Sequence, residues 1–143
     1  MLVAVVGLAV GAVVVLSSVL RSDPAQPSAG ATETLLAAGD IAECGTQGDE
    51  RTAKILDRFP DAAIATLGDN AYPDGSETDF GRCFGPSWGR HRERIRPATG
   101  NHEFTTKDAA GYFKYFGEAG GQFDEYYYSY DLGAWHVVVL NSD

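Results

Sequence analysis

Three glycine-led motifs carry side chains that could bind a metal ion. They are Gly39-Asp40, Gly68-Asp69-Asn70-Ala71-Tyr72 and Gly100-Asn101-His102-Glu103. A short run that is mostly apolar precedes each motif, and an oxygen donor follows each glycine directly. Hard cations prefer carboxylate, amide and phenolate oxygens. The three motifs therefore indicate a cation site if the fold brings them together.

The runs before the glycines predict the strands that position these motifs. Residues 34–38, 62–67 and 97–99 are short, and about thirty residues separate one from the next. Residues 48–59 place apolar side chains near helical spacing, which predicts a helix between the first two strands. A right-handed crossover makes those strands parallel and brings the first two motifs to one sheet edge. Each glycine is expected to let the chain turn there.

Two further elements are expected after the third motif. Asp108 is placed to cap a short helix. The aromatic side chains of that helix suit a core or loop packing, and they are Tyr112, Phe113, Tyr115 and Phe116. Residues 126–131 and 134–140 predict two strands around a tight turn. Trp135 and residues 137–140 suit a sheet interior.

Composition limits the class of protein. The 143 residues allow one domain, and an apolar fraction of 44% supports a core. The net charge of -9 argues against nucleic acid as a partner, because phosphate backbones are bound by Lys/Arg-rich surfaces. The acidity fits cation binding, and it equally fits a solvated acidic surface.

The N-terminal region predicts export. Residues 1–20 contain no charged side chain, which fits a signal peptide or a membrane anchor that would tether the protein. A buried globular helix is the alternative. Residues 21–32 are rich in Pro, Ser, Ala and Gly and predict a flexible linker. The remaining domain spans residues 33–143, and the protein is expected to be secreted or held at the cell surface.

Cys44 and Cys83 are the only cysteines. An even pair in an exported protein predicts a disulfide. Closing a loop of about forty residues contributes about 4 kcal/mol in the chain-entropy model. Two buried free thiols are the alternative, and two sulfurs without nearby histidines make a poor zinc site.

Two other patterns allow competing chemistry. A basic cluster suits either a phosphate clamp or a solvated face that offsets nearby acid, and it consists of Arg82, Arg90, Arg92, Arg94 and Arg96 with His91 and Glu93. Gly85-Pro86-Ser87-Trp88-Gly89 matches the G-x-S-x-G nucleophile elbow. That elbow needs a buried strand before it, and residues 79–84 make a poor strand. A serine hydrolase is therefore not expected.

The three motifs, in this order and at this spacing, resemble the first three blocks of the calcineurin-like metallophosphoesterases. Tyr72 lies three residues after Asp69, and Ala42 stands where some members have a histidine. These two features are similar to the purple acid phosphatase branch. The resemblance covers residues 34–143. It implies an α/β fold with a partial β-sandwich flanked by helices, which is four-layered (α/β/β/α) in the intact family.

The resemblance also implies roles for the motif residues. Asp40 and Tyr72 would bind one metal ion, typically iron, and Asp69 would bridge it to a second ion. Asn101 would bind that second ion, which is zinc, manganese or iron. His102 would stabilise or protonate the phosphoryl group of a small phosphoester substrate, which a metal-activated hydroxide attacks. Glu103 is either a partner that orients His102 or a surface side chain.

The family's remaining blocks have no counterpart in the sequence. Those blocks supply three histidines, including a Gly-His-x-His, whereas the only histidine after His102 is His136 in an apolar run. His136 is expected to be structural. The chain is thus expected to be the N-terminal half of a larger enzyme or a truncated product, which binds metals weakly and hydrolyses little. The alternative function is a non-catalytic exported binding module that retains the scaffold.

Overall fold

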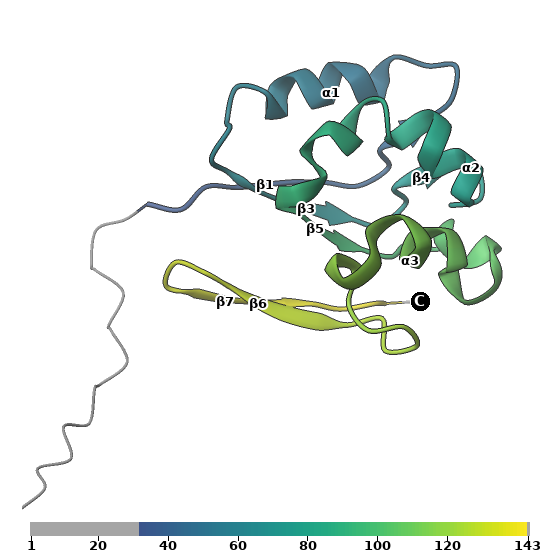
Figure 1. Ribbon diagram of the computed structural model, residues 1–143. Helices are drawn as coiled ribbons and strands as arrows, with labels where there is room; N and C mark the ends of the chain where they lie inside the picture. The colour runs from purple at the N-terminus through teal and green to yellow at the C-terminus, as the bar shows by residue number, and fades with distance from the viewer. Residues whose placement is uncertain (1–31, 143) are drawn as a thin grey trace, which may run out of the picture.

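The computed structural model describes residues 32–142. The expected signal peptide or anchor of residues 1–20 lies outside this part, as do residues 21–31 of the expected linker. Between residues 32 and 142, no helix combines the length and the apolar character that crossing a membrane requires. The described elements combine helices and strands, which confirms the α/β class (Figure 1).

The elements follow one another along the chain in this order: β1 (Leu35–Ala38), β2 (Ala42–Glu43), α1 (Gly48–Leu56), β3 (Ala63–Leu67), β4 (Ala71–Tyr72), α2 (Glu77–Asp79), η1 (Phe80–Phe84), η2 (Trp88–Arg94), β5 (Ile95–Ala98), η3 (Glu103–Thr105), η4 (Lys107–Ala109), α3 (Ala110–Phe116), η5 (Gly117–Gly120), β6 (Tyr128–Leu132) and β7 (Trp135–Val139).

A parallel sheet of three strands, in the order β1-β3-β5, lies at the centre of the fold. Leu36 pairs with Ile64, and Ile64 pairs in turn with Ile95, so the three strands run in register. Ile64 and Ile95 are fully buried in the core. The expected strands and their parallel direction are confirmed, and their carboxyl ends meet at one edge.

Helix α1 connects β1 to β3 and packs through Ala53 and Leu56, which are both buried. Asp49 and Glu50 lie in its first turn, where the helix dipole favours acid. The helix ends at Leu56, earlier than expected. Backbone hydrogen bonds of the tighter i to i+3 kind, including Phe59 N–H to Leu56 C=O at 3.1 Å, close its last turn before Pro60.

The aromatic side chains between β5 and β6 pack as expected, but Asp108 does not cap the helix as predicted. Tyr112 and Phe116 of α3 are buried in the core. Ala109 is the N-cap of α3, and no side chain bonds to its free N–H groups. Asp108 has φ of 55° and lies one residue too early. The predicted Asp108 cap is wrong because the chain enters α3 through two consecutive left-handed residues.

Strands β6 and β7 form the expected antiparallel hairpin, which lies on the side of the sheet opposite α1 (Figure 1). The expected sheet interior is wrong for part of β7. Trp135, Val138 and Leu140 are 74%, 55% and 69% exposed. Successive strand residues point to opposite faces. Val138 and Leu140 lie on the exposed face. Trp135 shares the face of the half-buried Val137 and Val139 but lies at the turn end of the strand.

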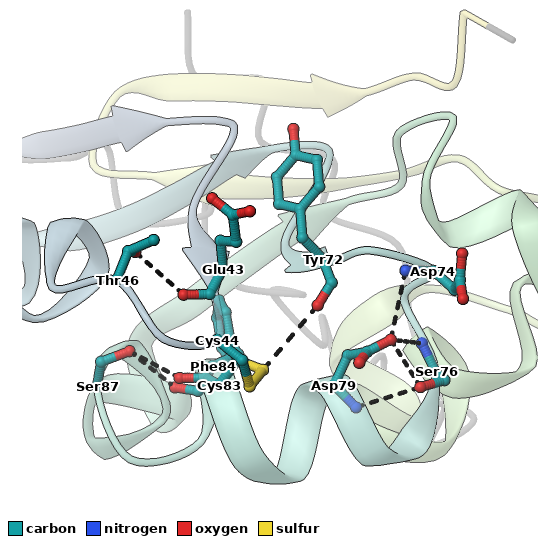
Figure 2. The surroundings of a disulfide bond; sticks show 10 residues. All are labelled: Glu43, Cys44, Thr46, Tyr72, Asp74, Ser76, Asp79, Cys83, Phe84 and Ser87. Carbon is teal, nitrogen blue, oxygen red and sulfur yellow. Dashed lines mark hydrogen bonds between the residues drawn. A yellow bond between two sulfur atoms is a disulfide. The ribbon is translucent and has the colours of Figure 1, made fainter.

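The predicted disulfide is present and links Cys44 to Cys83 across 39 positions, with 4.9 Å between their Cα atoms. Figure 2 shows it below Tyr72, between the chain that follows β2 and the helical turn η1. Cys83 is buried in the core, while Cys44 is exposed. The disulfide thus ties the first motif's loop to the helical layer.

Candidate metal centre

The carboxyl ends of β1 and β3 bring two carboxylates to one phenol. Asp40 follows β1, Asp69 follows β3, and Tyr72 ends the short strand β4. The Tyr72 hydroxyl lies 2.5 Å from Asp40 Oδ1 and 3.2 Å from Asp69 Oδ2. One phenol proton serves one strong bond, so Asp40 receives it and Asp69 makes the longer contact. Three predicted ligands from two separate motifs are therefore adjacent.

At the sheet edge, the aspartates of the motifs contribute to the turns of the chain as well as the glycines. Asp40 has φ of 51° and Asp69 has φ of 49°, in the left-handed region that short polar side chains tolerate best after glycine. Of the three motif glycines, Gly68 alone has a positive φ, 93°. Gly100 is needed for space, because a Cβ there would overlap the amide nitrogen and Oδ1 of Asp69. The sequence pattern predicted turns at the glycines alone.

The Tyr72 phenol retains its proton in this arrangement. Burial raises the pKa of Tyr72 well above its ordinary value, and the Asp40 and Asp69 carboxylates raise it further. None of the ion pairs in residues 32–142 involves either aspartate. The cluster therefore carries negative charge that no neighbouring cationic side chain offsets through a salt bridge.

The third motif approaches the same cluster through its backbone and its imidazole. The His102 N–H donates to Asp69 Oδ1 at 3.0 Å, and the His102 ring lies 4.4 Å from the Tyr72 ring. His102 Nδ1 lies 2.5 Å from the Pro73 carbonyl, which can only accept, so Nδ1 carries a proton. This bond raises the pKa of His102. Asn101 lies just before His102 with an exposed side chain.

Glu103 supports the site from below. It is fully buried, and its carboxylate accepts from four main-chain N–H groups of the two motif loops. Oε2 accepts from Asp69 and Gly100 at 3.1 and 2.8 Å, and Oε1 accepts from Asn70 and Ala71 at 2.9 and 3.4 Å. Burial raises the pKa of Glu103, and these N–H bonds oppose that shift. The expected surface position of Glu103 is therefore wrong, and its hydrogen bonds go to the ligand loops, while Pro73 and not Glu103 bonds to the imidazole of His102.

Sequence reasoning missed one acidic neighbour of the site. Glu43 pairs with Tyr72 between β2 and β4, and Figure 2 shows both side chains pointing away from the disulfide. Both residues line a hollow of about 380 Å³ together with Asp40 and Thr46. The signal available in the sequence was an acid three residues after Asp40. Glu43 adds a carboxylate to the wall of this hollow.

The other sequence candidates lie in other settings. Arg90 bonds to Glu50 and Asp57 on the side of α1. Arg94 donates to the carbonyl of Leu56, the last residue of α1, and to that of Ala62, just before β3. These side chains precede β5, at the sheet edge opposite the third motif. The Ser87 hydroxyl is buried and donates to carbonyls of η1. A helical segment precedes Ser87 instead of the strand that a nucleophile elbow requires, as expected.

His136 lies on the hairpin, in β7 as expected. Its Nδ1 is 2.7 Å from Asp131 Oδ1 of β6, and the two residues are cross-strand partners. Both side chains are mostly exposed, at 64% and 80%. His136 therefore takes part in a surface pair on the hairpin.

The donor set suits hard cations. Asp40, Asp69 and Tyr72 offer carboxylate and phenol oxygens within hydrogen-bonding distance of one another, and Asn101 offers an amide on the adjoining loop. No cluster of three or more His, Cys, Asp or Glu side chains that could hold a metal occurs in residues 32–142. The candidate set has two side chains of those four types, and its other oxygen donors are a phenol and an amide.

Comparison with protein families, with curated proteins and with solved structures gave no match. The site is therefore interpreted from its own geometry and from the motif pattern.

Proposed function

We propose that this chain forms part of a metal-dependent phosphoester hydrolase of the metallophosphoesterase type, with the motif pattern of the purple acid phosphatase branch. The contact of the Tyr72 hydroxyl with both Asp40 and Asp69 carries the proposal. These side chains follow different strands of a parallel sheet, whose carboxyl edge is where α/β folds place their sites.

The proposed centre holds two metal ions. Asp40 and Tyr72 would bind iron, Asp69 would bridge, and Asn101 would bind the second ion, which is zinc, manganese or iron. The surplus of negative charge and the choice of oxygen donors support this assignment. Bound ions would supply Lewis acidity that polarises a phosphoryl oxygen and lowers the pKa of a water molecule.

The chain's own residues prepare this centre in three ways. Glu103 fixes the main chain of Asp69 and Gly100, and the His102 N–H fixes Asp69 Oδ1. Pro73 holds the Nδ1 proton of His102, which leaves Nε2 for the phosphoryl group or its leaving oxygen. The substrate class is a small phosphoester.

The hairpin supports the architectural part of the proposal. Strands β6 and β7 cover the face of the sheet opposite α1, and the Tyr128 hydroxyl donates to the Pro97 carbonyl at 2.8 Å. The Arg96 guanidinium lies 5.6 Å from the centre of the Tyr130 ring. We assign the hairpin to the second sheet of a partial β-sandwich, as in the α/β/β/α arrangement.

Metal titration tests the proposal on the full chain. We expect the wild type to bind ferric iron and zinc weakly, and Asp69→Asn to lower the affinity at least tenfold. Asp61→Asn, an exposed carboxylate before β3, is the matched control and leaves binding unchanged. Turnover of p-nitrophenyl phosphate is expected to be slight.

Two results would count against the proposal. Equal metal affinity of the wild type and Asp69→Asn would show that Asp69 is not a metal ligand. Absence of binding by both removes the metal centre, and it favours the exported binding module instead. Turnover like that of an ordinary phosphatase would contradict the expected incompleteness of the site.

A further inference from the structure

The segment that carries Asp40 has few backbone ties of its own. Ile41 N–H donates to Asp69 C=O at 3.0 Å, and Ala42 N–H donates to Asn70 C=O at 3.1 Å. Strands β2 and β4 are two residues long, and a pair this short is marginal by itself. Asp40 is also exposed. Ile41 and Ala42 are buried in the core, but Asp40 itself is outside it, so a further tie near this segment would add to what holds Asp40 against Tyr72.

The disulfide provides that tie. Cys44 comes directly after β2, and Cys83 belongs to η1, which contacts both β2 and β4. Cys83 Sγ lies 4.0 Å from the Tyr72 carbonyl oxygen. A sulfur in a disulfide carries no hydrogen, so this is a packing contact. Figure 2 shows the Tyr72 ring pointing the opposite way, and its hydroxyl contacts Asp40 and Asp69.

The other half of the site has separate supports. Asp69 is held by Glu103 Oε2 and by the His102 N–H. Glu103 lies between the loops after β3 and β5 and is fully buried. None of these bonds involves Cys44 or Cys83. Breaking the disulfide should therefore release one half of the site and leave the other in place.

We propose that the Cys44–Cys83 disulfide is a positioning element of the candidate metal centre, which keeps Asp40 in contact with Tyr72. The inference rests on the proposed function for its metal-binding consequence. Its structural consequence is independent of any metal, and the two can be measured apart.

Hydrogen exchange on the full chain measures the structural consequence. A phosphine reductant cleaves the S–S bond, and the two sulfurs take up two electrons and two protons while the phosphine gains oxygen from water. The chain has two cysteines and both are in this bond, so the reagent has one target. We expect amide exchange at Ile41 and Ala42 to rise at least tenfold, while Ile64 and Thr66 of β3 stay protected.

Metal titration of the double variant Cys44→Ser/Cys83→Ser measures the other consequence without a reductant present. We expect its affinity for ferric iron to fall at least tenfold, with far-UV circular dichroism unchanged. Reoxidation of the reduced wild type should restore both the protection and the affinity.

The outcomes separate the two claims. Unchanged exchange at Ile41 and Ala42 after reduction overturns the inference, and so does a loss of protection that spreads equally through β3. Metal binding absent from the oxidised wild type overturns the proposed function, while the exchange result still decides what the disulfide does. Equal affinity of wild type and double variant, with binding present, overturns the positioning role.

Discussion

Glu103 holds Asp69 through the main chain: its Oε2 accepts the Asp69 N–H at 3.1 Å from beneath the candidate site. The same oxygen accepts from Gly100, and the other oxygen accepts from Asn70 and Ala71. One buried carboxylate thus joins the loops that follow β3 and β5. The geometry of the site therefore depends on the Glu103 carboxylate as much as on the candidate ligands.

Replacing Glu103 with Gln is expected to destabilise the fold. Each carboxylate oxygen accepts two N–H groups, so an amide NH₂ in either place leaves two buried donors without an acceptor. We expect a loss of about 2–4 kcal/mol in the free energy of unfolding. Urea denaturation measures it. Glu118→Gln, at an exposed position in η5, is the control and should change stability by less than about 0.5 kcal/mol.

Tyr72→Phe is expected to weaken the site while preserving the ring packing. The variant removes the only hydroxyl between Asp40 and Asp69, which leaves their charges without that shared partner. We expect the free energy of unfolding to fall by about 1 kcal/mol, because the site is partly exposed. Ferric phenolates absorb visible light, so iron should colour the wild type and leave Tyr72→Phe colourless. Tyr127→Phe, at an exposed tyrosine, should keep the colour. Colour retained by Tyr72→Phe would contradict its role as a ligand.

Gly100→Ala is expected to disrupt the contact between the two loops. The added methyl group would overlap the amide nitrogen and Oδ1 of Asp69, and backbone must move to make room. Overpacking of this kind costs about 1–3 kcal/mol. Gly81→Ala is the matched control, because nothing lies within 4 Å of a Cβ there. Melting temperatures of the two variants compare them directly. Equal values would show that the loops adapt freely.

His91 is expected to make stability depend on pH. Arg94 Nη2 lies 3.1 Å from His91 Nδ1 and can only donate, so Nδ1 accepts and the imidazole is neutral. Burial lowers the pKa of His91 below its ordinary 6.5, and Arg94 lowers it further, against an opposing effect of Asp57. As the pH drops, the unfolded chain therefore binds a proton at His91 at a higher pH than the folded chain does. The contribution of His91 to stability should therefore fall as pH drops from 7.5 to 5, by at most about 1.4 kcal/mol per pH unit for one proton, whereas the raised pKa of His102 acts in the opposite direction.

The measurement compares urea unfolding of the wild type and His91→Gln across this range. The variant should lose less stability than the wild type as the pH drops. Asp57, whose pKa the Arg90 hydrogen bond lowers, contributes stability that is lost only below about pH 4. Its effect therefore lies outside the measured window. Parallel profiles for wild type and His91→Gln would exclude His91 as the source.

Local pattern was sufficient for the longer strands, the crossover and the disulfide pair, but it did not predict the two-residue strands β2 and β4. The strands before Gly39 and Gly68 and the helix between them follow from apolar runs and helical spacing, and the parallel direction follows from the handedness of such crossovers. Local pattern failed at Asp108, because the entry to α3 depends on how the preceding turn packs. It also failed at Val138, because apolar character alone does not say which face of a strand is covered.

The sequence by itself determined the types of oxygen donor, their order, and their placement after strands that end at one sheet edge. Only the tertiary structure decided which groups meet there: that Tyr72 reaches Asp40, that Glu103 supports main chain while Pro73 holds the His102 ring, and that Glu43 joins the wall. Strand pattern specifies where a side chain lies along the chain. Contacts between distant loops depend on backbone angles and packing that no single segment contains.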